Sequence, residues 1–485
     1  MSELKKNIIW NFITKFILIF FSFFITRIIV NQYGAEIYGL FSITLVFTGY
    51  LTILDFGMQI STIKFVSQYK NSSGEKQEIY SSIFFAVVIT SVLITLIGYL
   101  FINTMVELLK IPEQMKTDAI ICFKIVLIAV FCNFFNMYFR GIIIAHNYMR
   151  FSSINNVVVT ILKLLLSALL ALQGYSIIAI VGIYVLSRVI ETTVQFYIVK
   201  KMIGWKFSTE NVNVNRMKEI APYSAKMFIS NLVSMSTTYL DKLIIGFYLP
   251  IQYISYYQVP YNLSSKTNII QSNIVPAVFP NFVTKNGEIG SNVKELYFKS
   301  NYYIIILLAP ICFGLSIFSK EILTLWINPE FAENSFMVLK IIAPAFLFAS
   351  MSIVIINLAN ANKMENIILI IHIIYLGIFL LLMSLFVKIY GVIGAAFAFL
   401  ISNFISWLIF SFWINISKNL LKEYFLKTFK ILIIPILVVL VTISIKTFIA
   451  LYLSLIFYLV SSIIIYLNEG RKYVKSYRIG RNSNI

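Results

Sequence analysis

Nine basic residues lie inside long apolar stretches of this 485-residue chain, where a charged side chain is costly. They are Lys15, Arg27, Lys124, Lys163, Arg188, Lys226, Lys242, Lys266 and Lys340. On insertion scales a charge at the centre of a bilayer costs about 2.5–3.5 kcal/mol, so each of these side chains should face protein, water or a ligand. Lysine and arginine bind phosphates and carboxylates through charge-assisted hydrogen bonds. The pattern therefore predicts an anion-binding site inside a membrane.

Depth within the apolar stretches separates these nine residues. Arg27, Lys124, Lys242 and Lys340 lie near the outer ends of their stretches, where long side chains can also reach the membrane surface. Lys163, Arg188 and Lys266 lie too deep for that. Arg188 has Glu191 three residues later on the same helical face, which favours a structural ion pair. Lys163 has no acidic neighbour in sequence, and this makes it the stronger candidate for an anionic ligand.

Three other titratable residues inside apolar stretches could couple transport to a proton or an ion. Asp55 could exchange a proton, or it could neutralise Lys266 or Lys64. Asp241 stands beside Lys242 and could simply pair with it. His372 could titrate near neutral pH, although a histidine at such a position more often belongs to the core.

The composition excludes a soluble protein. Apolar residues make up 59% of the chain and charged residues only 12%, about half the usual share in soluble domains. Apolar runs of about 20 residues recur from end to end, each long enough for a helix to cross the hydrocarbon core. The sequence predicts an all-α integral membrane protein with about 14 transmembrane helices. The expected spans are 8–31, 37–60, 80–103, 118–140, 152–172, 176–199, 219–247, 252–279, 298–319, 335–358, 366–387, 391–414, 428–446 and 449–467.

The net charge of +19 reflects topology and does not indicate a nucleic-acid partner. Most Lys and Arg residues outside the spans fall in alternate connections, and the tail after residue 469 adds more. Because cytoplasmic loops accumulate positive charge, both termini are predicted to be cytoplasmic.

The second half of the chain repeats the first at a constant shift of 215 residues. The shift carries Tyr33 onto Tyr248, Asn147 onto Asn362 and Ser187 onto Ser402. It predicts two six-helix lobes of equal orientation, related by a pseudo-two-fold axis along the membrane normal, as in alternating-access transporters. The predicted segments are an N-lobe at 1–205, a basic cytoplasmic linker at 206–218, a C-lobe at 219–424, two extra helices at 425–468, and a basic cytoplasmic tail at 469–485.

The repeat also groups some of the charges. Lys226 corresponds to Asn11, which lies one helical turn from Lys15, and Lys266 corresponds to Leu51, one turn from Asp55. Equivalent faces of equivalent helices should line the cleft between the lobes. The sequence therefore predicts a cationic central cavity, which suits an anionic substrate better than a cationic drug.

No catalytic or metal-binding pattern accompanies these charges. The three cysteines, Cys122, Cys132 and Cys312, lie in apolar runs without metal-ligand spacing. Nucleotide-binding and hydrolase motifs are also missing from the sequence. We expect no cofactor, no metal and no enzymatic activity.

Several segments resemble the Wzx family of polysaccharide flippases. They are NQYGAEIYGLFSI, LTILDFGM, FRGIIIAHNYM and TTYLDKLIIGFYL, which begin at residues 31, 51, 139 and 237. Wzx proteins belong to the MOP superfamily, together with the MATE exporters and the lipid II flippase. The resemblance implies an inner-membrane protein of bacteria that moves oligosaccharide repeat units linked to undecaprenyl pyrophosphate, for O-antigen, lipopolysaccharide or capsule, to the periplasmic leaflet. Polymerase and chain-length proteins would be its partners. A MATE-like ion-coupled drug exporter and, less favoured, a membrane polymerase or ligase are the alternatives.

Overall fold

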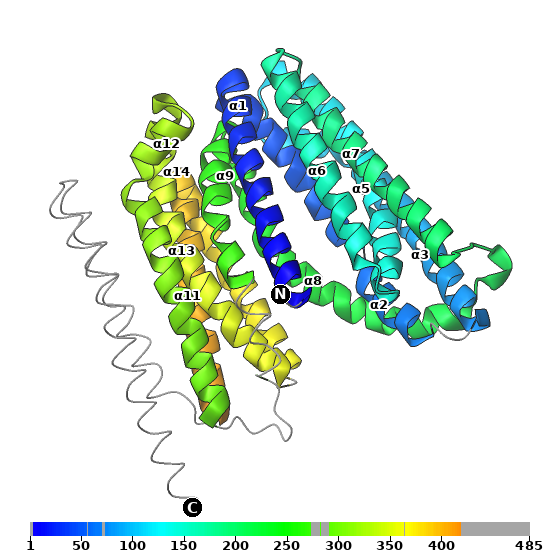
Figure 1. Ribbon diagram of the computed structural model, residues 1–485. Coiled ribbons are helices and arrows are strands. Elements are labelled where there is room, and N and C mark those ends of the chain that lie inside the picture. The colour runs from blue at the N-terminus through cyan, green and yellow to red at the C-terminus, as the bar shows by residue number, and fades with distance from the viewer. Residues whose placement is uncertain are drawn as a thin grey trace, which may run out of the picture. The chain divides into compact units, whose positions relative to one another are not determined.

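The chain is helical, with no strand in the residues that the structure, a computed structural model, describes: 3–55, 57–69, 73–272, 282, 291–362 and 364–418. Side chains are described for most of these residues, but not for residues 3–17 or Lys226. The helices (Figure 1) are α1 (Glu3–Ile53), α2 (Met58–Gln68), α3 (Ser73–Leu100), α4 (Ile102–Leu108), α5 (Glu113–Ala145), α6 (Met149–Leu172), α7 (Ile177–Ile198), η1 (Val199–Ile203), η2 (Thr209–Asn211), α8 (Val214–Tyr248), α9 (Gln252–Ser265), α11 (Ser291–Ile317), α12 (Ser319–Trp326), α13 (Pro329–Ala361) and α14 (Glu365–Lys418).

The predicted all-α membrane fold is confirmed. Eight helices among the described residues are long and apolar enough to cross a membrane. Two of these, Leu18–Ile53 and Asn366–Trp413, are long enough to contain two predicted spans each. Every predicted span from the first to the twelfth falls at least partly on a helix. The predicted helices 13 and 14 and the tail lie outside the described residues.

In each of these two longest helices, one glycine lies at the break between two spans. Gly34 in α1 has φ 79° and Gly391 in α14 has φ 60°. A glycine adopts this left-handed conformation without the steric penalty that a Cβ atom brings. Each break lies at or beside the turn that the hydropathy pattern predicted, between residues 31 and 37 and between residues 387 and 391.

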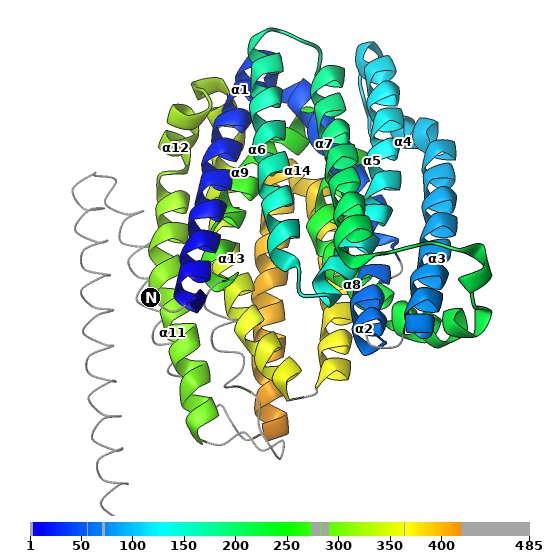
Figure 2. The ribbon, with the colours of Figure 1, turned by 45° about the vertical axis from the view of Figure 1, so that its right-hand side comes forward.

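The residues of the chain divide into two compact units. Unit 1 consists of residues 1–259, 326–331 and 379–395, and unit 2 of the remaining segments up to residue 485. In unit 1, α5 is the central helix and packs against α7, α2, α3 and α1; α5, α6 and α7 run side by side (Figure 2). In unit 2, buried side chains of α11, α13 and α14, such as Leu308, Val354 and Trp407, form the core.

Large apolar side chains on the outside of unit 1 identify the surface that contacts lipid. On α3, Ile89, Leu93 and Leu96 are 42%, 51% and 53% exposed. On α6, Leu162 and Leu169 are 52% and 53% exposed. Water would disfavour so large an apolar surface, whereas hydrocarbon accepts it, provided that the backbone hydrogen bonds are satisfied within the helices.

The connection between α7 and α8 is held firmly against the first six spans. Trp205 is 7% exposed, and its indole Nε1 donates to Tyr138 Oη at 2.9 Å. Tyr138 Oη in turn donates to the carbonyl of Tyr80 at 2.8 Å. Two residues after the end of η2, the amide of Asn213 donates to Ser82 Oγ at 3.0 Å. The segment from Trp205 to Asn213, which we call the strap, therefore packs against α3 and α5.

Residues 326–331 pack on α1, although they follow it by some 300 positions in the chain. The Trp326 ring stacks on Phe23 with centroids 4.0 Å apart, and its Nε1 donates to the Phe23 carbonyl at 3.0 Å. Asn31 donates to the Ile327 carbonyl at 3.1 Å and accepts from Asn328 Nδ2 at 2.7 Å. These contacts join the predicted outer end of the first span to a predicted outer loop of the C-lobe.

Alanine in place of Gly57 is expected to destabilise the fold. Gly57 has φ 67°, and an added Cβ would lie 2.7 Å from Met227 Cβ and 2.8 Å from the Ser224 carbonyl of α8. Backbone strain and crowding together should cost about 1–3 kcal/mol. Thermal unfolding of the detergent-solubilised protein measures the loss. Gly182→Ala is the matched control, because its added Cβ meets nothing within 4 Å; equal stability of the two variants would contradict the prediction.

Candidate substrate-binding site

The structure brings together the two deep basic residues of α6 and α7. Lys163 Nζ on α6 lies 4.5 Å from the centroid of the Tyr184 ring on α7. Arg188 follows Tyr184 by one turn on the same face, and it is a charge that interacts with Lys163. Lys163 is half-buried and the Arg188 side chain is 41% exposed, so both cationic groups remain partly accessible.

Glu191 balances Arg188, as the helical spacing predicted. Arg188 Nη1 lies 2.8 Å from Glu191 Oε2, and the Glu191 side chain is only 5% exposed. The other carboxylate oxygen, Oε1, accepts from Asn156 Nδ2 of α6 at 3.2 Å. Asn155 Nδ2 donates to the backbone carbonyl of Glu191 at 3.2 Å. Glu191 is thus oriented by α6, pairs with Arg188 and also attracts Lys163, so the three residues together keep one net positive charge.

The same cluster extends to α8. Arg188 interacts electrostatically with Tyr239 of α8, and the Tyr239 ring lies against Gly49 of α1. A group bound at Lys163 and Arg188 would therefore meet two cations and the Tyr184 ring, at a site built by α6 and α7. Two cations and one carboxylate give a net charge of one positive, which suits a phosphate or a carboxylate.

Lys242 and Asp241 form a fully buried ion pair in α8. Lys242 Nζ lies 2.9 Å from Asp241 Oδ2, and the two side chains are 2% and 0% exposed. Nζ also donates to the Thr238 carbonyl at 2.5 Å. The sequence placed Lys242 among the substrate-binding residues and Asp241 among the coupling candidates. In this conformation the two side chains serve each other instead, because no surface reaches either of them.

Asp55 lies just before the start of α2. Its Oδ1 accepts from the amide of Gly57, the residue that directly precedes α2, at 2.8 Å. This amide is one of the donors without a partner inside the helix, which a carboxylate satisfies well. Lys64, one of the partners considered for Asp55, instead places Nζ 3.8 Å from the centroid of the Tyr223 ring. The geometry gives Asp55 a structural role, and its role in coupling stays a prediction.

The remaining candidates are dispersed. Arg27 and Lys124 are exposed, and Lys124 Nζ lies 5.9 Å from the Tyr99 ring centroid. Lys266, in the turn after α9, Lys340 on α13 and His372 on α14 are half-buried in unit 2, where the His372 ring packs on Phe410 at 5.6 Å. Lys15 and Lys226 lie on α1 and α8, but their side chains are outside the described set, so their shared face stays a prediction.

Three residues in or near this site were not identified from the sequence: Asn156, Tyr184 and Tyr239. The spacing of Tyr184 and Arg188, four residues apart, was a usable signal. Asn156 and Tyr239 gave none, because their relevance depends on how α6, α7 and α8 pack. Among the described residues, no group of three or more His, Cys, Asp or Glu side chains could hold a metal ion.

Comparisons with known proteins agree with this architecture. A proposed O-antigen transporter of Shigella flexneri is 24% identical over 398 residues, which cover 81% of this chain and 93% of that protein. The lipid II flippase MurJ in an inward closed conformation matches the structure with a TM-score of 0.73 and 18% identity, over 97% of this chain and 99% of MurJ. An inward-facing MATE multidrug transporter of the MOP superfamily matches with a TM-score of 0.65 and 13% identity, over 82% and 94% of the two chains.

The family assignment follows from a match across more than half of the chain. The family model described as "Polysaccharide biosynthesis protein" covers residues 4–286, from the start of α1 past the end of α9. The relatives are transporters and flippases rather than enzymes. This chain belongs to the polysaccharide biosynthesis protein family and is a multi-pass membrane protein with the fold of the lipid II flippase MurJ and of the MATE transporters.

Proposed function

We propose that the protein is a flippase for oligosaccharide repeat units linked to undecaprenyl pyrophosphate. The observation that carries the proposal is the intramembrane pair of Lys163 and Arg188, which share the single carboxylate of Glu191 and so keep one net positive charge. A pyrophosphate presents several anionic oxygens to such a pair, and field lines concentrate in a cleft with low-dielectric walls. The family and the O-antigen transporter relative support the same class of substrate.

In the proposed cycle, the repeat unit enters from the cytoplasmic side, and its pyrophosphate binds the basic side chains while the prenyl chain stays in lipid. Rocking of the two lobes then exposes the site to the other side. The other predicted basic residues, Lys15, Lys226 and Lys266, would extend the cationic path. The proposal places the protein in the inner membrane of a bacterium with both termini in the cytoplasm, where polymerase and chain-length proteins would act on its product.

Deletion of the gene provides the test. We expect surface polysaccharide to fall to background and lipid-linked repeat units to accumulate on the cytoplasmic leaflet, with recovery of both when the gene is supplied on a plasmid. The MATE-like alternative predicts the opposite pattern. Normal polysaccharide together with a clear loss of tolerance to cationic drugs would overturn the flippase in favour of an exporter.

A further inference from the structure

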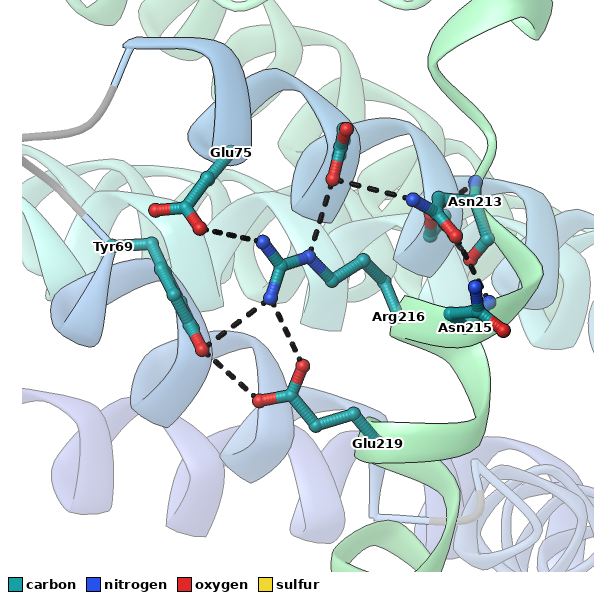
Figure 3. Close-up of polar contacts among 8 residues, drawn as sticks. Tyr69, Glu75, Asn213, Asn215, Arg216 and Glu219 are labelled. Carbon is teal, nitrogen blue, oxygen red and sulfur yellow. Dashed lines mark hydrogen bonds and ion pairs between the residues drawn. The ribbon is translucent and has the colours of Figure 1, made fainter.

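Arg216, in the first turn of α8, is bound by several acceptors at once (Figure 3). Its Nη2 lies 2.7 Å from Glu75 Oε1, its Nε 3.2 Å from Glu78 Oε2, and its Nη1 3.1 Å from Glu219 Oε2 and 3.4 Å from Tyr69 Oη. The planar guanidinium has five N–H donors in a fixed fork, so it can satisfy this set where a lysine could not. The three carboxylates raise the pKa of Arg216 further above its usual value, so its charge is permanent.

The acceptors connect α8 to helices of the predicted N-lobe. Glu75 and Glu78 belong to the first turns of α3, and Tyr69 directly follows α2. Tyr69 Oη also donates to Glu219 Oε1 at 3.1 Å, which links α2 to α8 a second time. Arg216 therefore fastens the first helix of the second repeat to α2 and α3 of the first repeat.

Contacts on both sides of Arg216 extend this attachment. Before it, Asn213 is bound to Ser82 of α3, and the strap from Trp205 is docked as described above. After it, Lys64 of α2 lies over the Tyr223 ring, and Ser61 Oγ and Ser224 Oγ are 2.7 Å apart in a buried hydrogen bond. The chain is thus attached to α2, α3 and α5 from Trp205 to Ser224, with the Arg216 cluster in the middle.

The predicted outer end of unit 1 is joined in a different way. There, Asn31 and Phe23 of α1 meet residues 326–328 through three hydrogen bonds and one stacked aromatic pair. The two partners are some 300 residues apart in the chain, so no short covalent connection reinforces this junction. Separating it requires these contacts to break.

We propose that the Arg216 cluster is a pivot. The cytoplasmic end of α8 stays on α2 and α3 throughout the transport cycle, and the contacts of Asn31 with residues 327 and 328 are the ones that open and close. This inference rests on the alternating-access function proposed above. It differs from a gate at Arg216, in which the cluster would have to break once in every cycle.

Paired cysteines in a background without Cys122, Cys132 and Cys312 (each replaced by Ala) distinguish the two possibilities. A disulfide in S61C/S224C would join α2 to α8 covalently, which we call the inner attachment. A disulfide in N31C/N328C would join α1 to the segment 326–328, which we call the outer junction. After oxidation with copper phenanthroline, export of newly made polysaccharide should remain within about twofold of the unoxidised cells for the inner pair. It should fall at least tenfold for the outer pair and return on reduction with dithiothreitol. Loss of export in the oxidised inner pair, reversible by reduction, would overturn the pivot. Normal export with both pairs fully cross-linked would instead overturn the alternating-access flippase itself.

A second variant tests the role of Arg216 directly. R216Q removes the ion pairs and should lower export several-fold at normal protein level. Adding the oxidised S61C/S224C disulfide to R216Q should restore export, because a covalent link replaces the electrostatic one. If Arg216 instead acted on the substrate or had to release α8, the disulfide would give no recovery, and the proposal would fail.

Discussion

Replacing Lys163 with methionine is expected to lower surface polysaccharide by roughly ten- to a hundredfold. Methionine keeps the length and the packing of the lysine stem but removes one of the two cations that share the single carboxylate of Glu191. A hydrogen bond to a charged group contributes about 1.5–3 kcal/mol, and each 1.4 kcal/mol corresponds to a factor of ten. Because Arg188 is already held by Glu191, it cannot replace the lost charge. Quantitative immunodetection of surface polysaccharide, normalised to the membrane level of the protein, measures the effect.

Two controls make this result specific. Lys163→Arg retains the charge and should retain most of the export. Lys200→Met removes an exposed lysine that lies over Phe196, at the end of α7, and should leave export unchanged. If Lys163→Met exports as well as the unmodified protein at equal level, then the pair of Lys163 and Arg188 does not bind the substrate.

Breaking the ion pair of Asp241 and Lys242 is expected to have the largest effect on the fold. In soluble proteins, removing one partner of a buried pair costs about 3–5 kcal/mol, because the other charge is left without compensation in a low-dielectric interior. Both side chains are essentially inaccessible here, so we expect a loss of the same order for Lys242→Met and for Asp241→Leu. Thermal unfolding in detergent and the amount of protein in membranes report it.

The double variant D241L/K242M separates the ion pair from a role in transport. Replacing both charges with apolar groups removes the desolvation cost together with the attraction, so the double variant should recover most of the lost stability. A double variant that is folded and still exports polysaccharide would show that the pair is structural. Single variants that fold normally would contradict the prediction and would return Asp241 to the candidates for ion coupling.

Much of the fold could be predicted because the membrane constrains the sequence so strongly. The hydrocarbon core requires apolar runs of a nearly constant length, which is why the spans on α3, α5, α6 and α7 agree with the structure. Gly34 and Gly391 lie at breaks that hydropathy had already indicated. Ion pairs within one helix could also be predicted from the sequence, because residues three apart share a face. The pair of Arg188 and Glu191 follows this rule.

Contacts between helices could not be predicted in the same way. The rotation of α6 about its axis decides whether Lys163 meets α7, and that rotation depends on packing against several neighbours. The same reason explains Lys242, which hydropathy alone would allow to snorkel to the surface but which packing encloses with Asp241. The attachment of Arg216 to Glu75 and Glu78 joins residues some 140 positions apart, and no spacing rule reaches that far.

The sequence by itself determined that this protein is a helical membrane protein with an excess of basic residues in its apolar runs, because burial in hydrocarbon leaves few alternatives for such runs and for rare charges. Only the tertiary structure decided which of those charges act together. Lys163 lies over the Tyr184 ring near Arg188, Lys242 forms a buried ion pair with Asp241, and Asp55 accepts a hydrogen bond from Gly57 at the start of α2. The physical reason is that a charge inside a membrane must find a partner, but the partner is selected by the packing of helices far apart in the chain.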